Sequence, residues 1–194
     1  MQDAHGTTLS IASLPHAARR KLAVMRVVMV AVAVVGYVLD RWTKAWALDN
    51  LSGGPGESWL NGWLRLQLVL NPGAAFSMGS SVTIVFTVLS SIALVAVFIW
   101  GWPRVNSWLT AFVGGAVVCG IAGNLTDRLI RPPGVLRGEV VDFISVQHFA
   151  VFNVADIFIT CAAIGLAIHL LRAERSERPS AGSATDDTES TDAP

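Results

Sequence analysis

The chain has 194 residues, of which 53% are hydrophobic and only 14% are charged. This balance lies outside the range of soluble globular domains and within that of membrane proteins. The 14 Lys and Arg residues match 14 Asp and Glu residues, so the formal net charge is zero. The composition therefore gives no electrostatic reason to expect a nucleic-acid partner.

Four apolar segments are long enough to cross a hydrocarbon core, which takes about 20 residues of helix. They lack the apolar/polar alternation of membrane β-barrel strands, so we expect helices. We predict an all-α membrane fold: four transmembrane helices with a small β-element and short surface segments on the outer face. The predicted spans run approximately over Leu22–Leu39, Val82–Trp102, Trp108–Gly123 and Val154–Leu171. The expected organisation is an N-terminal segment (1–21), a membrane domain (22–171) and a disordered tail (172–194).

The distribution of Lys and Arg around the spans predicts the orientation in the membrane. Seven of these residues lie on the side of the termini and six on the opposite side, so the bias is small. The compact cluster at 19–21, before the first span, favours that end as cytoplasmic, since the first helix usually dominates. Both termini are then predicted to be cytoplasmic.

The first outer loop, residues 40–81, contains the sequence WLRLQLVLN at 63–71. Its leucines at 64, 66, 68 and 70 alternate with polar or smaller residues, which predicts a strand with all four leucines on one face. The next residues, NPGAAFS at 71–77, contain a Pro-Gly pair typical of a turn. Without other information, this stretch is interpreted as a turn that leads into the second span.

Acidic residues of the membrane region gather at one predicted boundary. Asp40 ends the first span there together with Lys44, Asp127 follows the third span, Asp142 lies in the connection, and Asp156 begins the fourth. A carboxylate at a membrane boundary is costly to desolvate, so such a residue is by default a candidate functional residue. An aspartic protease requires at least two carboxylates that lie close together.

Two asparagines accompany these carboxylates. Asn124 extends a line of small residues, Ala116 and Gly120, that favours close helix packing in lipid, and it lies three residues before Asp127. Asn153 fits the N-cap of the fourth helix, with Asp156 at the third helical position. A purely structural capping role for Asp156 stays open on this segment alone.

Five motifs together resemble lipoprotein signal peptidase, also called signal peptidase II. They are DRWTKAWA from residue 40, NPGAAFS from 71, GNLTDR from 123, VVDF from 140 and FNVAD from 152, and the resemblance covers approximately residues 22–171. It implies a bacterial membrane aspartic protease that removes the signal peptide of a prolipoprotein before its lipid-modified cysteine. The stretch between VVDF and FNVAD is shorter than in many members of the family, which leaves open how a surface helix would cover the site.

The resemblance also implies roles for individual residues. Asp142 and Asp156 match the catalytic pair, and the matching supporting or substrate-binding positions are Asp40, Lys44, Asn71, Gly73, Asn124, Asp127, Arg128 and Asn153. The implied partners are prolipoproteins with a lipid-modified cysteine and membrane lipid. The implied location is the bacterial cell membrane, with the site near the outer face.

The chemistry of paired carboxylates agrees with this assignment. Two close carboxylates share a proton, so one can activate water while the other donates a hydrogen bond to the scissile carbonyl. Helix-dipole arguments favour Asp156 as the base and Asp142 as the acid. No cofactor or metal is expected, because this chemistry requires none, and the sequence agrees in that it has no HExxH motif. We also expect Arg128 to pair with Asp127 or to contact a substrate carbonyl.

Two other classes of function remain open from the sequence. A small ion or proton transporter could use Asp40, Lys44, Asp127 and Asp156 as a relay, although these residues gather at one boundary and do not cross the membrane. A non-catalytic membrane chaperone could hold lipidated peptides. Cleavage of a prolipoprotein by the purified protein distinguishes the peptidase from both.

Overall fold

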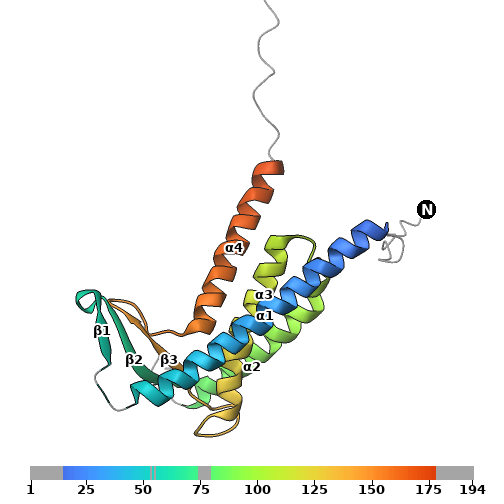
Figure 1. Ribbon diagram of the computed structural model, residues 1–194. Helices are drawn as coiled ribbons and strands as arrows, with labels where there is room; N and C mark the ends of the chain where they lie inside the picture. The colour runs from blue at the N-terminus through green and yellow to red at the C-terminus, as the bar shows by residue number, and fades with distance from the viewer. Residues whose placement is uncertain (1–14, 53, 55, 74–79, 178–194) are drawn as a thin grey trace, which may run out of the picture.

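The computed structural model describes residues 15–52, 54, 56–73 and 80–177 (Figure 1). Four of its helices are long and apolar enough to cross a membrane. They are α1 (His16–Leu51), α2 (Ser80–Ala96, continued by a π turn at Val97–Gly101 and a 3₁₀ turn at Trp102–Arg104), α3 (Trp108–Ile130) and α4 (Val154–Glu177). Three short strands complete the fold: β1 (Glu57–Trp59), β2 (Leu64–Asn71) and β3 (Val140–Val146). The predicted fold class is confirmed.

Three helices are longer than the sequence indicated. The helix α1 continues past Asp40 to Leu51, α3 continues past Gly123 to Ile130, and α4 continues past Leu171 to Glu177. Charged residues made the ends of α1 and α3 resemble loops, but these residues are paired with one another inside the protein. The predicted outer loop therefore begins near Ser52, and the predicted tail lies mostly outside the described residues.

The central helix of the bundle is α3, which packs against the other three helices. Its small residues permit close contact on two sides. A Cβ added at Gly115 would lie 2.6 Å from the Met29 carbonyl oxygen of α1, and one added at Gly120 would lie 2.7 Å from the Ala155 carbonyl oxygen of α4. Small residues allow such close backbone approach between helices in lipid. The predicted packing role of Gly120 is confirmed, and Ala116 beside it is fully buried.

The three strands form one antiparallel sheet in the order β1-β2-β3, beside the C-terminal end of α1 (Figure 1). Leu66 pairs with Ile144, whereas Leu70 pairs with Val141, so β2 uses one more residue than β3 between these pairs. This β-bulge reverses the alternation of side chains along β2. Leu66 and Leu70 therefore point to opposite faces, and the prediction that all four leucines share one face is wrong.

The connection between β3 and α4 is a short turn. A bridge between Ile144 and Phe152 closes it, and the rings of Phe149 and Phe152 pack edge to face at 5.9 Å. None of the described residues in this connection is helical. The surface helix that the resemblance led us to consider is replaced here by this turn, which carries the exposed side chain of Phe149.

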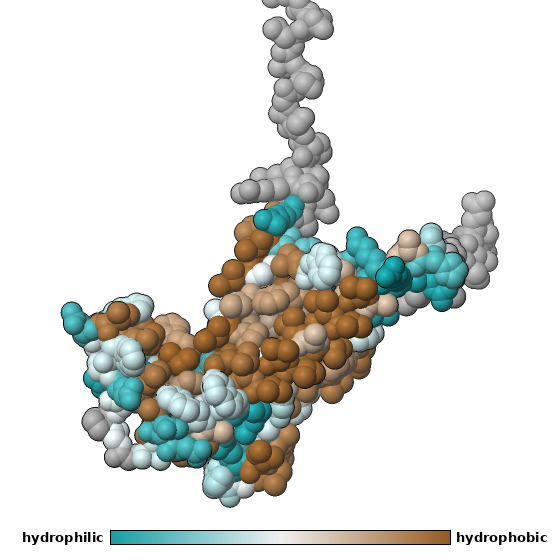
Figure 2. Space-filling model, viewed as in Figure 1, coloured by the Kyte–Doolittle hydropathy of each residue, from teal (hydrophilic) through white to brown (hydrophobic). Residues whose placement is uncertain are grey.

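Apolar side chains cover the outside of the helices, as the brown surface in Figure 2 shows. Exposed tryptophans lie near both ends of this apolar surface: Trp42 and Trp46 on the C-terminal part of α1, and Trp100 and Trp108 where α2 ends and α3 begins. Tryptophan is enriched at the two membrane–water interfaces. The two pairs indicate where each interface meets the bundle.

Candidate active site

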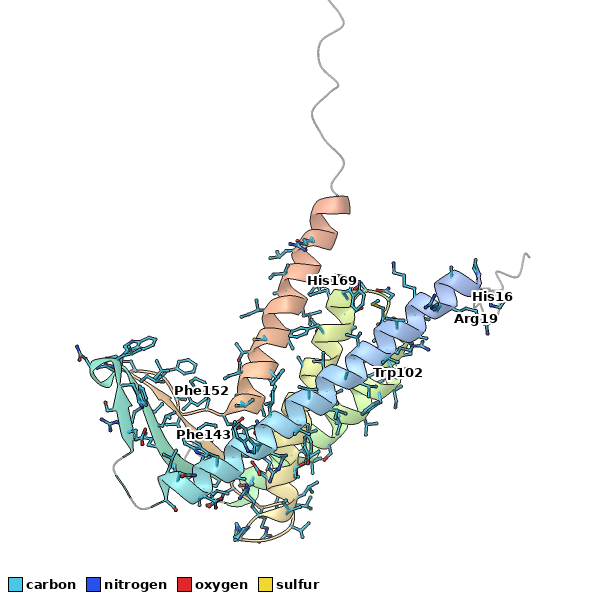
Figure 3. The ribbon with its side chains drawn as sticks, in the orientation of Figure 1. His16, Arg19, Trp102, Phe143, Phe152 and His169 are labelled. Atoms are coloured by element: carbon cyan, nitrogen blue, oxygen red, sulfur yellow. The ribbon has the colours of Figure 1, made fainter. Side chains whose placement is uncertain are left out.

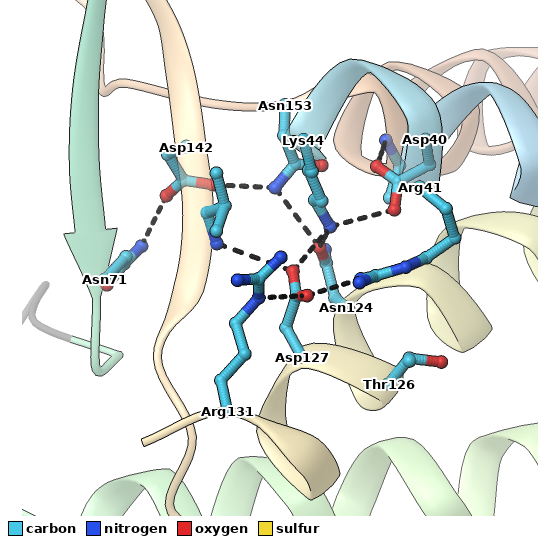
Figure 4. A network of polar contacts seen from close by, with 12 residues as sticks. Asp40, Arg41, Lys44, Asn71, Asn124, Thr126, Asp127, Arg131, Asp142 and Asn153 are labelled. Carbon is cyan, nitrogen blue, oxygen red and sulfur yellow. Dashed lines mark hydrogen bonds and ion pairs between the residues drawn. The ribbon is translucent and has the colours of Figure 1, made fainter. Parts of the chain in front are cut away.

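The polar motifs of the sequence meet in one network between the C-terminal half of α1, the end of α3, the strand β3 and the start of α4 (Figure 4). Most of its members are buried: the side chains of Asp40, Lys44, Asp127 and Asn153 are completely inaccessible, and Asp142 is 2% exposed. Polar groups buried this deeply require partners. The network supplies them residue by residue.

Asp142 lies on β3, and both of its carboxylate oxygens accept hydrogen bonds. The Asn71 side-chain amide donates to Oδ2 at 2.8 Å, and the Asn153 side-chain amide donates to Oδ1 at 2.6 Å. Asn71 is at the end of β2, after the bulge, on the same face as Val69, which pairs directly with Asp142. Without the additional residue, Asn71 would point to the other face of the sheet. The bulge thus directs Asn71 toward the carboxylate.

Asp156 lies in the first turn of α4 and forms a capping box with Asn153. The Asn153 side-chain oxygen accepts from the backbone N–H of Asp156, and the Asp156 Oδ2 accepts from the backbone N–H of Asn153, both at 3.1 Å. The two bonds satisfy backbone donors at the helix start that would otherwise lack partners. The N-cap predicted at Asn153 is present. Its side chain also reaches Asp142, so the cap connects the two carboxylates.

Asn124 joins Asp156 to the interior of the network. Its amide nitrogen donates to Asp156 Oδ1 at 2.8 Å, and its oxygen accepts from Lys44 Nζ at 2.9 Å and from the Asn153 amide at 3.1 Å. An ammonium group can only donate hydrogen bonds. Lys44 therefore fixes the Asn124 oxygen toward itself, which turns the Asn124 amide nitrogen toward Asp156.

Lys44 is the centre of a buried ion cluster. Its Nζ lies 2.9 Å from Asp40 Oδ2 and 2.9 Å from Asp127 Oδ2. On its other side, Asp127 Oδ1 lies 2.5 Å from Arg41 Nη1 and 2.6 Å from Arg131 Nε. These five charged residues come from α1, α3 and the C-cap of α3, and they tie the ends of the two helices together. A buried charge is tolerated only when it is paired in this way.

Asp40 also connects α1 to α4. Its Oδ1 accepts a hydrogen bond from the Ala155 backbone N–H at 2.9 Å, so a side chain of one helix caps the start of another. The approach is close: a Cβ added at Gly123 would clash with Asp40 Oδ2 and would lie 3.1 Å from Ala155 Cβ. Glycine at this position lets α1, α3 and α4 converge beneath the two candidate catalytic carboxylates.

The predicted pairing of Arg128 with Asp127 is wrong. Asp127 instead contacts Lys44, Arg41 and Arg131, because a side chain at the next position of the helix points away from it. The guanidinium of Arg128 lies 5.9 Å from the centre of the Phe86 ring of α2. Its Nε is buried and has no hydrogen-bond partner among the described residues. The alternative expectation, a contact with a substrate carbonyl, stays a prediction.

Gly73 follows Asn71 in a tight turn. Its backbone N–H donates to the Asn71 side-chain oxygen at 2.8 Å, and its φ of +96° belongs to the region that favours glycine. A Cβ there would lie 3.1 Å from the Phe86 ring. The turn predicted at this motif is confirmed at its first residues, and residues 74–79 lie outside the described part of the chain. Because Asn71 accepts from Gly73 through its oxygen, its amide nitrogen faces Asp142.

Burial raises the pKa of Asp142 from its usual value of 3.8 to about 6. Hydrogen bonds from Asn71 and Asn153 oppose this rise, whereas the nearby charge of Asp156 adds to it. Desolvation and a like charge both disfavour an anion, while donors favour it. Asp142 is therefore a carboxyl that can hold a proton in mildly acidic conditions, next to a second carboxylate.

Two members of the network were not singled out from the sequence as site residues. Arg41 and Arg131 were considered only as flanking cations, yet both contact Asp127. The spacing of Asp127 and Arg131, four residues apart on a helix, was the available signal for one of them. Arg41 comes from another helix, so no local pattern indicated its contact.

Comparisons with known proteins identify the family. A family model described as "Signal peptidase (SPase) II" matches residues 10–172. A lipoprotein signal peptidase of Streptomyces griseus is 37% identical over 166 residues, covering 86% of this chain and 83% of the relative. Lipoprotein signal peptidases of Streptomyces coelicolor and Mycobacterium tuberculosis are 40% and 41% identical, over 73% and 72% of this chain and 69% of each relative.

A solved structure described as a bacterial membrane enzyme, obtained by the in meso method, has a similar fold. Its TM-score to this chain is 0.63 at 25% sequence identity, and the match covers 80% of this chain and 94% of the other. A second structure of the same description has a TM-score of 0.62 at 27% identity. The sequence motifs, the four spanning helices and these likenesses agree, and the chain belongs to the signal peptidase II family, whose members remove signal peptides from lipoproteins.

Proposed function

We propose that the chain is an aspartic peptidase whose catalytic residues are Asp142 and Asp156. The observation that carries this proposal is the position of Asn153, which donates a hydrogen bond to Asp142 while it caps the helix turn that holds Asp156. One side chain thereby sets both carboxylates in a single network. Membership of a signal peptidase family favours the peptidase over the transporter and chaperone alternatives.

In the proposed reaction the ionised carboxylate removes a proton from water. The water oxygen attacks the scissile carbonyl carbon, and the neutral carboxyl gives its proton to the carbonyl oxygen. When the tetrahedral intermediate collapses, the C–N bond breaks, the leaving nitrogen takes a proton, and one hydroxyl returns its proton to the dyad. Each carboxyl is thus restored for the next cycle.

We assign the acid to Asp142 and the base to Asp156. The raised pKa of Asp142 supports the first role, because that carboxyl keeps its proton to higher pH than an ordinary Asp. The place of Asp156 in the first turn of α4 supports the second, because the positive end of a helix dipole stabilises an anion. Lys44 and Asn124 support the pair indirectly: Lys44 orients the side chain of Asn124, whose amide nitrogen donates a hydrogen bond to Asp156.

The proposed substrate is a prolipoprotein with a lipid-modified cysteine. Trp42 and Trp46 lie on α1 next to Asp40 and Lys44, which supports a position of the carboxylates near a membrane–water interface. A diacylglyceryl group on a cysteine would anchor the peptide at that level. Membrane lipid would surround the remaining surface of the substrate.

Two prolipoprotein substrates that differ only in the lipid on the cysteine test this proposal. Purified protein should cleave the lipid-modified substrate immediately before the cysteine, and the unmodified substrate at least about 100-fold more slowly, since loss of anchoring affects positioning. Mass spectrometry of both products measures the site and the rate. Equal cleavage of the two substrates contradicts the assigned substrate class.

The proposed orientation has both termini in the cytoplasm and the site at the outer face of the bacterial cell membrane. The compact cluster of cations at 19–21, before the first span, supports this orientation, because the first helix usually dominates the positive-inside bias. The test starts from a protein in which the native Cys119 and Cys161 are replaced by Ala, and adds one cysteine, either Arg137→Cys or Arg19→Cys. A membrane-impermeant maleimide should label Arg137→Cys from the outside and Arg19→Cys from the inside. The reverse pattern contradicts the orientation.

A further inference from the structure

A groove of about 410 Å³ lies between α3, α4 and the connection from α2 to α3, at the end of the bundle opposite to the carboxylates. We call it the α3–α4 groove. Its polar part includes Arg104, Asn106 and His169, and its apolar part includes Leu109, Val113 and Leu166. Figure 3 labels His169 on α4 near the start of α3. None of the catalytic or supporting residues of the proposed site lines this groove.

The charge of the α3–α4 groove has one sign. Its lining includes the guanidinium of Arg104 and has no acidic side chain, and the imidazole of His169 adds a further hydrogen-bonding group. One of the five N–H donors of Arg104 is used on the Trp100 carbonyl oxygen, at 2.6 Å. The groove also lies at the first turn of α3, the positive end of that helix. These features match an anionic group.

Apart from Thr110, whose hydroxyl is bonded within the capping box at the start of α3, the remaining lining of the groove is apolar. Leu109 and Val113 lie on consecutive turns of α3, and Leu166 faces the groove from α4, where Gly165 lets the two helices approach: a Cβ added there would lie 2.9 Å from Val113 Cγ2. The apolar residues continue from the cationic end toward the middle of the membrane span. A water-soluble anion would leave this part of the groove without a partner.

The position of the groove relative to the membrane selects the occupant. The exposed rings of Trp100 and Trp108 mark this end of the bundle as an interface, and Arg104 lies between them in the chain. Basic pockets between transmembrane helices at an interface are suited to the head groups of anionic lipids. We propose that the α3–α4 groove binds one anionic phospholipid, with its phosphodiester at Arg104 and His169 and an acyl chain along Leu109, Val113 and Leu166.

Retention of lipid by the full-length protein tests this proposal independently of peptidase activity. The protein is purified in detergent, depleted of lipid and titrated with phosphatidylglycerol or phosphatidylcholine, and bound lipid is counted by native mass spectrometry. We expect one tightly held phosphatidylglycerol, and about fivefold weaker binding of it by the Arg104→Gln variant, because a cation near lipid phosphate contributes roughly that much. The matched control Arg19→Gln, an exposed cation at the same membrane side, should bind as the parent does.

A second pair of variants examines the acyl-chain part of the groove. Leu166→Trp adds bulk at a side chain that is 48% exposed and lines the groove, whereas Leu170→Trp adds it at a side chain that is 56% exposed and does not. Only Leu166→Trp should weaken phosphatidylglycerol binding, with the melting temperature of both variants unchanged. If Arg104→Gln fails to fold, this pair and His169→Gln still test whether phosphatidylglycerol binds in the same groove.

Three outcomes would overturn the proposal. Equal losses in Arg104→Gln and Arg19→Gln would mean that general surface charge holds the lipid. Displacement of phosphatidylglycerol by glycerol phosphate at similar concentration would mean an anion site without an acyl-chain component. Equal retention of phosphatidylcholine and phosphatidylglycerol would mean that the charge of Arg104 does not select the occupant of the groove.

Discussion

Replacing either candidate catalytic carboxylate should abolish peptidase activity. Asp142→Asn and Asp156→Asn each keep the shape of the side chain but remove a group that can exchange a proton, and loss of such acid–base help costs about 10² to 10⁴ in rate. Both variants should still insert into the membrane and bind substrate. The rate of cleavage of a lipid-modified prolipoprotein by purified protein measures the effect.

The matched control for the dyad variants is Asp49→Asn, which removes an exposed carboxylate near the end of α1. It should cleave substrate at the parental rate. The melting temperature of each protein in detergent separates loss of chemistry from loss of fold. Near-normal turnover by Asp142→Asn or Asp156→Asn would remove that residue from the mechanism.

Replacing Lys44 should have the largest effect on stability. Lys44→Met keeps most of the volume but leaves Asp40 without its ion-pair partner, in a place where both side chains are completely buried. Breaking a buried ion pair by removing one partner costs about 3 to 5 kcal/mol. The free energy of unfolding in detergent should fall by about that amount.

Lys44→Met should also lose more activity than the fraction of unfolded protein accounts for. Without the ammonium, only the 3.1 Å hydrogen bond from the Asn153 amide holds the Asn124 oxygen away from Asp156, so the amide can turn more easily and present an oxygen to the carboxylate. The control is Lys21→Met, an exposed lysine near the start of α1. A Lys44→Met protein with parental stability would mean that the buried cluster does not hold the helices together.

The membrane fold was predictable because its strongest determinants are local. Apolar runs of sufficient length gave the four spans, and the N-cap at Asn153 was readable from its type and its distance to Asp156. Helix ends were less predictable where charged residues lie within the last turns of the helix. Asp40 and Lys44 resemble the start of a loop in sequence, but their ion pair lets α1 continue to Leu51.

The parts that the sequence did not reveal depend on contacts between distant segments. The strand β3 was interpreted as a connection, because its pairing with β2 is set by residues about seventy positions earlier in the chain. The bulge in β2 likewise has no signal in a regular run of leucines, although it decides where Asn71 points. Arg41 joined the site only because α1 and α3 pack side by side.

We propose that Asp142 and Asp156 act as a coupled pair that shares a proton. The infrared carboxyl band of Asp142, isolated by subtracting the spectrum of Asp142→Asn, reports its protonation directly as the pH is raised. In the parent protein the band should disappear around pH 6, since burial and the charge of Asp156 raise the pKa of Asp142 to about 6.

The same titration in Asp156→Asn tests the coupling. Removing the neighbouring negative charge takes away one cause of the raised pKa, so the Asp142 band, isolated here by subtracting the Asp142→Asn/Asp156→Asn double variant, should disappear at lower pH than in the parent. That shift is the result expected of a catalytic dyad. A band that titrates at the same pH in both proteins would mean that the two carboxylates do not sense each other, and it would contradict the assignment of Asp142 and Asp156 as a pair.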